Sequence, residues 1–291
     1  MKIHALLTGL ISVKNAYVEG IARMRALRLA GSLLDSHFRL IPVYTWVIEH
    51  PEGVIVIDAG ETAQAREPDF FPALQRPYWR TQFQFQVNPI DEIGVQLFRR
   101  GIDPKTVRTV ILTHAHFDHT DGLYHFPNAR VLISPREWRA LRRWREWHFS
   151  FPEKWEQIVK PAVIQYRPER IGAFSESYPV TNAGDVWIVP TPGHTVGHQS
   201  VMLHADGVTY FFGGDTSFDQ DSLYHNVIDA PTLNSHQALA TRRQILETAA
   251  QMPLVYLTTH DFETERRLEN RDVLRDDHPG LPMPSEPMFV V

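Results

Sequence analysis

Short runs of apolar, mostly β-branched residues recur along the chain, and each is bounded by Gly, Pro, Asp or His, as buried strands usually are. Besides a first strand within 3–13, these runs lie at 43–49, 54–57, 107–112, 130–133, 186–189, 208–212 and 254–257. Between some of them, residues 91–100 and 235–250 show helical spacing, and the second helix is expected to begin at Ser235 as its capping residue. This mixture predicts a layered α/β fold. No linker separates two halves, so we expect a single domain.

The composition narrows the kinds of site and partner. The chain contains no cysteine, which excludes disulfides and thiolate metal sites and leaves imidazole and carboxylate as metal ligands. A formal net charge of -5, without a block of like charges, gives no attraction toward nucleic acid. No apolar stretch approaches the ~18 residues of a membrane span, and the N-terminal stretch favours a strand over a signal peptide. We therefore expect a soluble, cytoplasmic protein with no membrane or nucleic-acid partner.

Two segments interrupt the strand pattern and are expected as insertions. Residues 67–89 concentrate aromatic side chains among prolines without a sustained period, which suggests a lid. Residues 135–151 show helical spacing and contain five arginines, which predicts a helical insertion. The simpler interpretation of this helix is an amphipathic one with solvated arginines and with tryptophans packed on the core. A pocket-lining helix or the interface of a homodimer is the alternative.

The densest group of chemically active side chains follows the strand expected at 107–112. Residues 114–119 read His-Ala-His-Phe-Asp-His. Alternate residues that leave a strand point the same way, so His114 and His116 can share one metal while Asp118 and His119 address a second. Histidine accounts for 15 of the 291 residues, and chance would produce this pattern with a probability of roughly 0.002. The segment therefore indicates a metal site rather than a histidine-rich solvated turn.

Three further strand ends present side chains that complete such a site. His194 follows Thr-Pro-Gly, Asp215 follows Gly-Gly and His260 follows Thr-Thr. Each motif comes directly after an expected strand, and open α/β folds place their sites at strand ends. Any one of these residues alone is weak evidence, because a histidine after Pro-Gly or a Gly-Gly-Asp turn is more often structural. Together with the first segment they provide a full set of ligands for two metals.

This order of motifs resembles that of the metallo-β-lactamase superfamily, in which His-X-His-X-Asp-His is followed by single His, Asp and His ligands. The match extends from Asp58 to His260. It implies a four-layer αββα sandwich with the metals at one edge between the sheets. The resemblance also assigns the ligands: the first metal is held by His114, His116 and His194, the second by Asp118, His119 and His260, and Asp215 bridges the two.

Two more polar residues match supporting positions of this pattern. Asp58 lies in Ile-Asp-Ala-Gly, which resembles the family's early Asp-X-Gly element, and is expected to steady the histidine segment by accepting hydrogen bonds. His198, four residues after His194, is expected to fix its loop rather than to bind metal. Histidines such as His125 and His236 have no motif around them and are expected to be ordinary surface or core residues.

Such a site suits hydrolysis. Two divalent cations lower the pKa of a bridging water toward neutrality and polarise an ester carbonyl, so hydroxide is the nucleophile and no serine or cysteine is needed. Asp118 is expected to combine metal binding with orientation of the hydroxide, and Asp215 is the second carboxylate expected to be catalytic. Nitrogen and oxygen ligands suit zinc, the default metal, but also cobalt, manganese, iron or nickel.

Within the superfamily the chain looks most similar to the N-acyl homoserine lactonases, the quorum-quenching lactonases. The resemblance rests on residues 113–122 and 191–200, on Asp215 followed by Thr-Ser, and on the early hairpin at 42–60. Zinc β-lactamases that resemble this site lack the bridging carboxylate or use cysteine near it. Glyoxalase II-like thioesterases add a C-terminal helical region, and the nuclease branches add an RNA-gripping arm and a basic face. Another ester or thioester hydrolase, and less favourably a phosphodiesterase, are the alternatives.

The substrate side of the site is expected to be aromatic, because aromatic rings offer apolar area to an acyl chain with few torsions to order. The side chains proposed for this pocket are Phe70, Phe71, Trp79, Phe83, Phe218 and Tyr224. Simple core packing is the alternative for the first four. Many lactonases of this group carry a tyrosine three residues after the bridging aspartate, where this chain has Phe218. A nearby hydroxyl such as that of Tyr224, metals acting alone, or a different lactone or ester would each account for the change.

Overall fold

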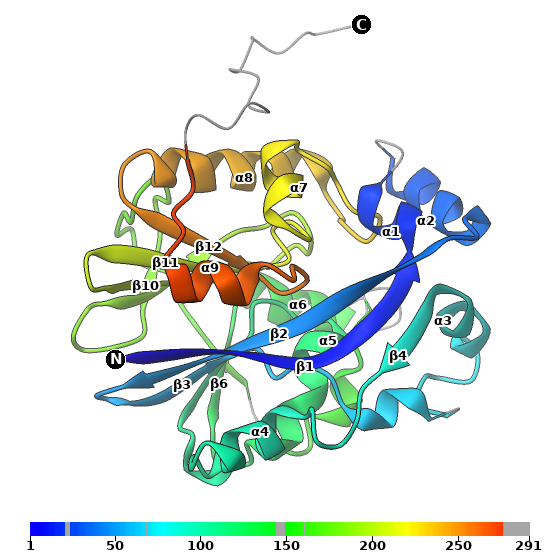
Figure 1. Ribbon diagram of the computed structural model, residues 1–291, viewed down its shortest axis with the longest axis horizontal. Coiled ribbons are helices and arrows are strands. Elements are labelled where there is room, and N and C mark those ends of the chain that lie inside the picture. The colour runs from blue at the N-terminus through cyan, green and yellow to red at the C-terminus, as the bar shows by residue number, and fades with distance from the viewer. Residues whose placement is uncertain (21–23, 68, 144–148, 160, 276–291) are drawn as a thin grey trace, which may run out of the picture.

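Two mixed β-sheets pack face to face, and helices cover the outer face of each sheet (Figure 1). This structure is a computed structural model, and it describes residues 1–20, 24–67, 69–143, 149–159 and 161–275. The order of layers is helix, sheet, sheet, helix. The expected four-layer αββα sandwich in a single domain is therefore confirmed.

The first sheet has seven strands in the described part of the chain. Their order across the sheet is β4 (Phe83–Gln86), β1 (Lys2–Lys14), β2 (Phe38–His50), β3 (Gly53–Ile57), β5 (Thr109–Ile111), β6 (Arg130–Ile133) and β7 (Pro161–Val163). β1 and β2 form a long antiparallel pair, whereas β3, β5, β6 and β7 run parallel to one another. The carboxyl ends of the parallel strands therefore meet at one edge.

The second sheet has five strands among the described residues. Their order is β12 (Leu254–Thr258), β11 (Val208–Gly214), β10 (Gln199–Ala205), β9 (Val186–Pro190) and β8 (Tyr178–Pro179). β11 and β12 are parallel, and β10 runs antiparallel to both β9 and β11. Consequently β9, β11 and β12 all end at the same edge of this sheet.

The core between the sheets follows the two-residue period of the strands. In β2, Trp46 and Ile48 face the second sheet, while Val47 between them faces the opposite, helix-covered side. Trp46 lies against Phe212 of β11, with ring centroids 5.6 Å apart. In β11, Phe211 in turn belongs to the core on the outer face of the second sheet. Because both faces of both sheets are apolar, each sheet is buried between two layers.

The helices complete the outer layers. On the first sheet, α4 (Ile93–Arg99) and α6 (Pro135–Arg143) contribute Leu97 and Leu141 to the core; on the second, α7 (Gln220–Tyr224) and α8 (Ser235–Ala249) contribute Leu223 and Ile245. The other helices are α1 (Asn15–Glu19), α2 (Arg25–Leu34), α3 (Arg76–Gln82), α5 (Phe117–Thr120) and α9 (Thr264–Asn270), with 3-10 turns η1 (Ala63–Arg66), η2 (Pro104–Thr106), η3 (Asp121–His125) and η4 (Pro152–Lys154). Within the described ranges, none of the helices combines the length and the apolar character that crossing a bilayer requires.

All the expected strands are present, but the short strands β4, β7 and β8 and the longer strand β10 have no counterpart among the expected runs. β10 carries a single β-branched residue, Val201, and starts with polar residues, so it lacks the composition typical of a buried strand. One helix cap also differs from the expectation. Asn234, not Ser235, caps α8, because its side chain accepts a hydrogen bond from the backbone N–H of Gln237 at 3.1 Å.

The two segments expected as insertions contain regular elements. Residues 67–89 include α3 and β4, and β4 extends the first sheet by pairing with β1; the role of this segment as a lid stays a prediction. Residues 135–151 begin with α6, whose Trp138 packs on the core while Arg139 is exposed, as in the amphipathic interpretation. The rest of that expected helix includes residues 144–148, which lie outside the described residues.

The sandwich predicts a strong dependence of stability on side chains between the sheets. Leu203 of β10 is fully buried there, so Leu203→Ala should lower the free energy of unfolding by about 2 to 5 kcal/mol in urea titrations. Leu74 is 94% exposed, and Leu74→Ala, the same chemical change, should stay within about 0.5 kcal/mol of wild type. Equal effects of the two substitutions would contradict the assignment of Leu203 to the core.

Candidate metal centre

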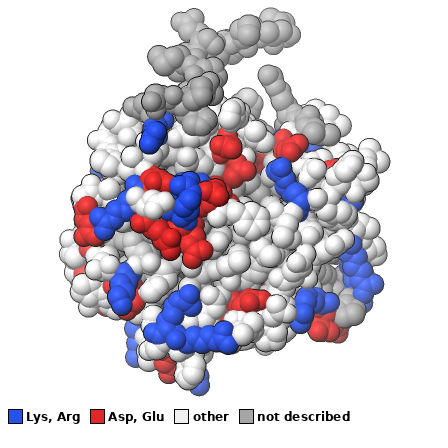
Figure 2. Space-filling model, in the orientation of Figure 1, with Lys and Arg blue, Asp and Glu red and all other residues white. Residues whose placement is uncertain are grey.

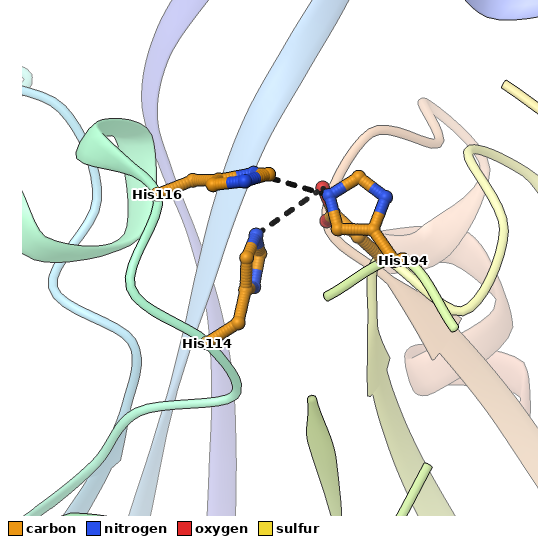
Figure 3. Close-up of side chains that lie close together, drawn as sticks. His114, His116 and His194 are labelled. Carbon is orange, nitrogen blue, oxygen red and sulfur yellow. Dashed lines mark hydrogen bonds and ion pairs between the residues drawn. The ribbon is translucent and has the colours of Figure 1, made fainter. Parts of the chain in front are cut away.

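The seven side chains that match metal ligands in the sequence all lie where strands end at one edge of the sandwich. They come from the loop and short helix after β5 (His114, His116, Asp118 and His119), the loop after β9 (His194), the residue after β11 (Asp215) and the second residue after β12 (His260). None of the seven is more than 9% exposed. In Figure 3 the imidazoles of His114 and His116 converge with that of His194 from a different loop. The fold thus brings together residues that are up to about half the chain apart.

These side chains form two groups that share the Asp215 carboxylate. One group comprises His114, His116, His194 and Asp215, and the other Asp118, His119 and His260; the ligand atoms within each group lie within 4.8 Å of one another. Asp215 Oδ2 lies 3.2 Å from His194 Nε2 and 3.5 Å from His260 Nε2, and its Oδ1 lies 3.3 Å from His119 Nε2. The carboxylate of Asp215 therefore contacts imidazoles of both groups.

Hydrogen bonds on the far side of two imidazoles fix which nitrogen faces the centre. The Nδ1 of His260 lies 2.8 Å from the carbonyl oxygen of Pro42. A carbonyl can only accept, so His260 carries its proton on Nδ1 and, when neutral, directs the lone pair of Nε2 inward. His119 Nδ1 lies 2.8 Å from Asp58 Oδ2, with the same consequence. This is the arrangement in which histidine binds a metal.

The electrostatics of the centre favour an ionised carboxylate. Burial acts to raise the pKa of Asp215, but the neighbouring imidazoles of His260, His119 and His194 hold this pKa well below its usual range. A negative charge in a buried position is stable only beside compensating positive charge. Asp215 is therefore an anion at the meeting point of the two groups.

The residues present fit divalent cations. His114 Nε2, His119 Nε2 and Asp215 Oδ1 are buried, and none of these atoms has a hydrogen-bond partner among the described residues. Buried polar atoms without partners are costly unless another group satisfies them. Two cations, one for each group, would satisfy all three atoms, and imidazole with carboxylate is a suitable ligand set for zinc and similar metals.

Asp58, expected to support the histidine segment, contacts two parts of it. Besides His119, its carboxylate accepts hydrogen bonds from the backbone N–H of Thr113 at 2.7 Å and from the Thr113 hydroxyl at 2.8 Å. Asp58 itself has a left-handed backbone, with φ of 58°. Asp and Asn tolerate this conformation better than most residues do. The end of β3 thus holds the start of the ligand segment and orients one ligand.

His198 is not among the ligand groups, and its contacts are those of a supporting residue. Its Nε2 accepts a hydrogen bond from the backbone N–H of Asp215 at 3.0 Å, and its Nδ1 lies 2.8 Å from the hydroxyl of Thr191. Burial, reinforced by nearby His194, lowers the pKa of His198 to about 3. The ring is therefore neutral and free to accept at Nε2, which positions the backbone of Asp215.

Glu137 also connects the ligand loops, and no motif pointed to it. This buried glutamate of α6 accepts hydrogen bonds from the backbone N–H of Ala115 at 3.1 Å, the hydroxyl of Thr195 at 2.7 Å and the backbone N–H of Gly197 at 3.1 Å. Ala115 lies between two candidate ligands, and Thr195 follows another. The sequence offers one sign of this role: Glu137 lies four residues before Leu141, and so on the apolar face of an arginine-rich helix.

Asp229 is a second supporting residue without a sequence signal. Its Oδ1 lies 3.4 Å from His194 Nδ1 and accepts hydrogen bonds from the backbone N–H and the hydroxyl of Thr232. Its carboxylate therefore faces the side of His194 that points away from the centre. Nothing in the sequence around Asp229 distinguishes it from an ordinary loop aspartate.

A small cavity of about 20 Å³ opens onto the metal centre. Its walls include Asp118, Asp215 and three of the candidate histidine ligands, and the rest of its lining is mainly apolar and aromatic. The lining residues other than ligands are Ile11, Val13, Tyr17, Ile41, Phe83, Phe117, Phe149, Phe218 and Pro231. An apolar and aromatic wall therefore lies directly beside the candidate ligands.

Only part of the expected aromatic pocket lines this cavity. Phe83 and Phe218 do so. Phe71 and Trp79 stack on each other in the aromatic core next to it, with centroids 4.8 Å apart, and Phe70 borders a different cavity. Tyr224 lies in the core on the outer face of the second sheet. Its hydroxyl contacts the backbone of Arg275 and not this cavity.

The contacts of Asp58 predict a specific loss of metal affinity. In Asp58→Asn the amide nitrogen cannot accept one of the three hydrogen bonds, so the Thr113 segment or His119 loses its support. Metal affinity, measured by competition with a chromogenic chelator, should fall about 10- to 100-fold. Asp206→Asn is a matched control, because Asp206 is exposed and has the same left-handed backbone, with φ of 52°. Affinity that is unchanged in Asp58→Asn would rule out this role.

Comparison with known proteins agrees with the geometry. The family model "Metallo-beta-lactamase superfamily" matches residues 39–260. A curated N-acyl homoserine lactonase from Bacillus sp is 26% identical over 239 residues, which cover 81% of this chain and 86% of that protein. An N-acyl homoserine lactonase from Azorhizobium caulinodans is 30% identical over 174 residues, which cover 56% of this chain and 60% of that protein. A solved N-acyl homoserine lactone hydrolase, with N-hexanoyl-L-homoserine bound at its catalytic metal centre, superposes with a TM-score of 0.73 at 21% identity and covers 91% of this chain and 95% of that one. The chain belongs to the metallo-β-lactamase superfamily.

Proposed function

We propose that this protein is a dinuclear metal-dependent hydrolase that opens lactone rings, with N-acyl homoserine lactones as the substrate class. One observation carries the proposal: ligands of both metal groups and an apolar, aromatic wall border the same small cavity, so a reacting carbonyl at the metals would have its acyl chain against that wall. The names of the relatives, which are N-acyl homoserine lactonases, support the same substrate class. Zinc is the proposed metal, on the chemistry of the ligands alone.

The roles of the two carboxylates follow from their positions. Bound divalent cations would supply a water of lowered pKa and would polarise the lactone carbonyl. Asp215, in contact with both ligand groups, holds the two halves of the centre in one geometry. Asp118 lines the cavity, and its Oδ2 lies 3.4 Å from His260 Nε2. Asp118 therefore orients water and accepts its proton on the side that faces the substrate.

The walls of the cavity account for the preference for an apolar acyl group. Ile11, Val13 and Ile41, all at most 6% exposed, line the side formed by β1 and β2. Phe83 of β4 adds an aromatic ring. Burial of each methylene of an acyl chain contributes roughly 0.8 kcal/mol to binding. In the proposed complex the acyl chain lies on this wall and the lactone carbonyl faces the metal centre.

Two alternative reactions have less support. Hydrolysis of another ester or of a thioester would use the same metal centre, and a panel of substrates distinguishes these reactions from lactone opening. Phosphodiester hydrolysis of nucleic acid calls for a basic binding face. On the face in Figure 2, acidic and basic side chains lie side by side over α9, where Arg266 pairs with Glu263 and Asp272. This face offers no continuous basic surface.

The proposal predicts metal-dependent opening of lactones. Purified protein with two equivalents of zinc should hydrolyse N-hexanoyl-L-homoserine lactone. The reaction is measured as the release of acid at constant pH. His116→Ala or Asp215→Ala should lower kcat at least about 10³-fold, because each removes a ligand from the catalytic centre. His236→Ala is the matched control, since His236 is exposed on α8 and outside the ligand groups.

The same assay separates the alternatives. Activity that persists after chelation and metal removal would overturn the proposed mechanism. No opening of acyl homoserine lactones across short and long chains, together with hydrolysis of thioesters or of bis-nitrophenyl phosphate, would overturn the proposed substrate class.

A further inference from the structure

Three residues after Asp215, the chain places the phenyl ring of Phe218, and not a hydroxyl, on the wall of the cavity. Phe218 lines the cavity and lies over His260, with ring centroids 4.9 Å apart and an angle of 25° between the rings. Its backbone carbonyl accepts a hydrogen bond from the Thr258 hydroxyl at 3.1 Å, which fixes this segment against β12. A phenyl ring offers no hydrogen-bond donor to a substrate. A protein hydroxyl that donates to a substrate beside Asp118, His119 and His260 must therefore come from another part of the chain.

Tyr17 of α1 lies on the same wall of the cavity. Its ring meets that of Phe218 edge to face, with centroids 6.3 Å apart, and that of Phe83 at 5.1 Å. Tyr17 is 7% exposed, and its hydroxyl makes no hydrogen bond to another residue in the described part of the chain. Tyr17 lines the cavity together with candidate metal ligands, so its hydroxyl is a donor without a partner among the described residues on this wall of the cavity.

The backbone holds Tyr17 in place from three sides. Its carbonyl accepts a hydrogen bond from the N–H of Ala230 at 2.8 Å. The two preceding residues are tied as well: the N–H of Asn15 donates to the carbonyl of His37, and the N–H of Ala16 donates to the Asp35 carboxylate at 2.8 Å. Such fixed placement lets a hydrogen-bond donor act without reorganising during the reaction.

The phenol stays protonated at neutral pH. Burial is the main cause of a raised pKa for Tyr17, and the neighbouring Tyr78 and Asp118 raise it further. Asp229 and Asp215 act in the same direction.

We infer that Tyr17 is a catalytic residue whose hydroxyl donates a hydrogen bond to the carbonyl oxygen of the bound lactone. This inference rests on the proposed function. In the reaction, the oxygen of water forms a bond to the carbonyl carbon and the ring C–O bond breaks. One proton of that water ends on the leaving ring oxygen and the other is released, leaving a carboxylate. Tyr17 keeps its proton throughout and stabilises the negative charge that develops on the carbonyl oxygen.

Other tyrosines near the site do not fill this position. Tyr224 is buried in the core on the outer face of the second sheet, as described above. Tyr78 packs against Trp79 and Phe149 in the aromatic cluster and does not line the cavity. Among the described residues that line the cavity, Tyr17 is the one with a phenolic hydroxyl.

The direct test is Tyr17→Phe, which removes one oxygen atom and keeps the ring. With zinc-loaded protein and N-hexanoyl-L-homoserine lactone, kcat should fall about 10- to 100-fold while KM changes less than about threefold, because the hydrogen bond strengthens as charge develops. Zinc content by atomic spectroscopy should equal that of wild type. Tyr78→Phe, the same change in the same aromatic cluster, should leave kcat unaltered.

Two further measurements complement the kcat of the single variant. Calorimetry with the ring-opened product, N-hexanoyl-L-homoserine, should give a Kd about 3- to 10-fold weaker for Tyr17→Phe than for wild type, since one hydrogen bond is lost. The double variant Tyr17→Phe with Phe218→Tyr returns a phenol to the cavity, and its kcat should exceed that of Tyr17→Phe at least fivefold.

The outcomes separate this inference from the proposed function. Tyr17→Phe with wild-type kcat and wild-type product affinity would overturn the role of Tyr17 alone. A reduced kcat accompanied by lost zinc, without recovery in the double variant, would also overturn it, because the residue would then be structural. Wild-type protein that opens no lactone would overturn the proposed function and this inference together.

Discussion

Five imidazoles and two carboxylates are buried together at one edge of the sandwich, and the geometry of the surrounding loops follows from this burial. Asp215 is the point at which the two groups meet, with imidazole nitrogens of both within 3.5 Å of its carboxylate oxygens. An arrangement of this kind is costly in an apolar interior unless cations occupy it. The ligands are kept together by the rigidity of the fold, and bound cations would in turn stabilise that fold.

The sandwich provides this rigidity through contacts behind the ligands. Asp58 at the end of β3 holds His119 and the Thr113 backbone, and Glu137 ties two ligand loops together from α6. Close packing reinforces these contacts: a Cβ at Gly122 would lie 2.1 Å from the carbonyl oxygen of Ala59, next to Asp58. The short loops at the strand ends are thus supported from several elements at once. Loops of this kind preserve ligand positions better than freely moving segments do.

Much of the fold and of the metal centre could be predicted from the sequence because both depend on local patterns. Short β-branched runs marked the strands, and each candidate ligand directly follows one of these runs, so the shared edge of the sheets was implied before the structure was known. β10 was missed because its burial comes from neighbouring strands rather than from its own composition. Its Gln199, for example, is fully buried although it is polar, and its side chain donates to the carbonyl of Leu112.

The substrate side could not be predicted in the same way, because it is assembled from side chains that no motif connects. Tyr17, Phe149 and Pro231 reach the cavity from three distant segments. An aromatic residue in a sequence indicates burial but not the face on which it will lie, which is why Phe71 and Trp79 proved to pack next to the cavity and not on its wall. The expected hydroxyl of Tyr224 was similarly misplaced: its helix, α7, covers the outer face of the second sheet.

The proposed metal centre holds two ions joined by Asp215. Anomalous diffraction at the zinc edge from crystals of the zinc-loaded protein, combined with metal analysis of the same preparation, tests it most directly. We expect two ions per chain, one among His114, His116 and His194 and the other among Asp118, His119 and His260, with the Asp215 carboxylate bound to both. A single ion per chain at saturating zinc, or two ions of which one lies away from these side chains, would contradict it.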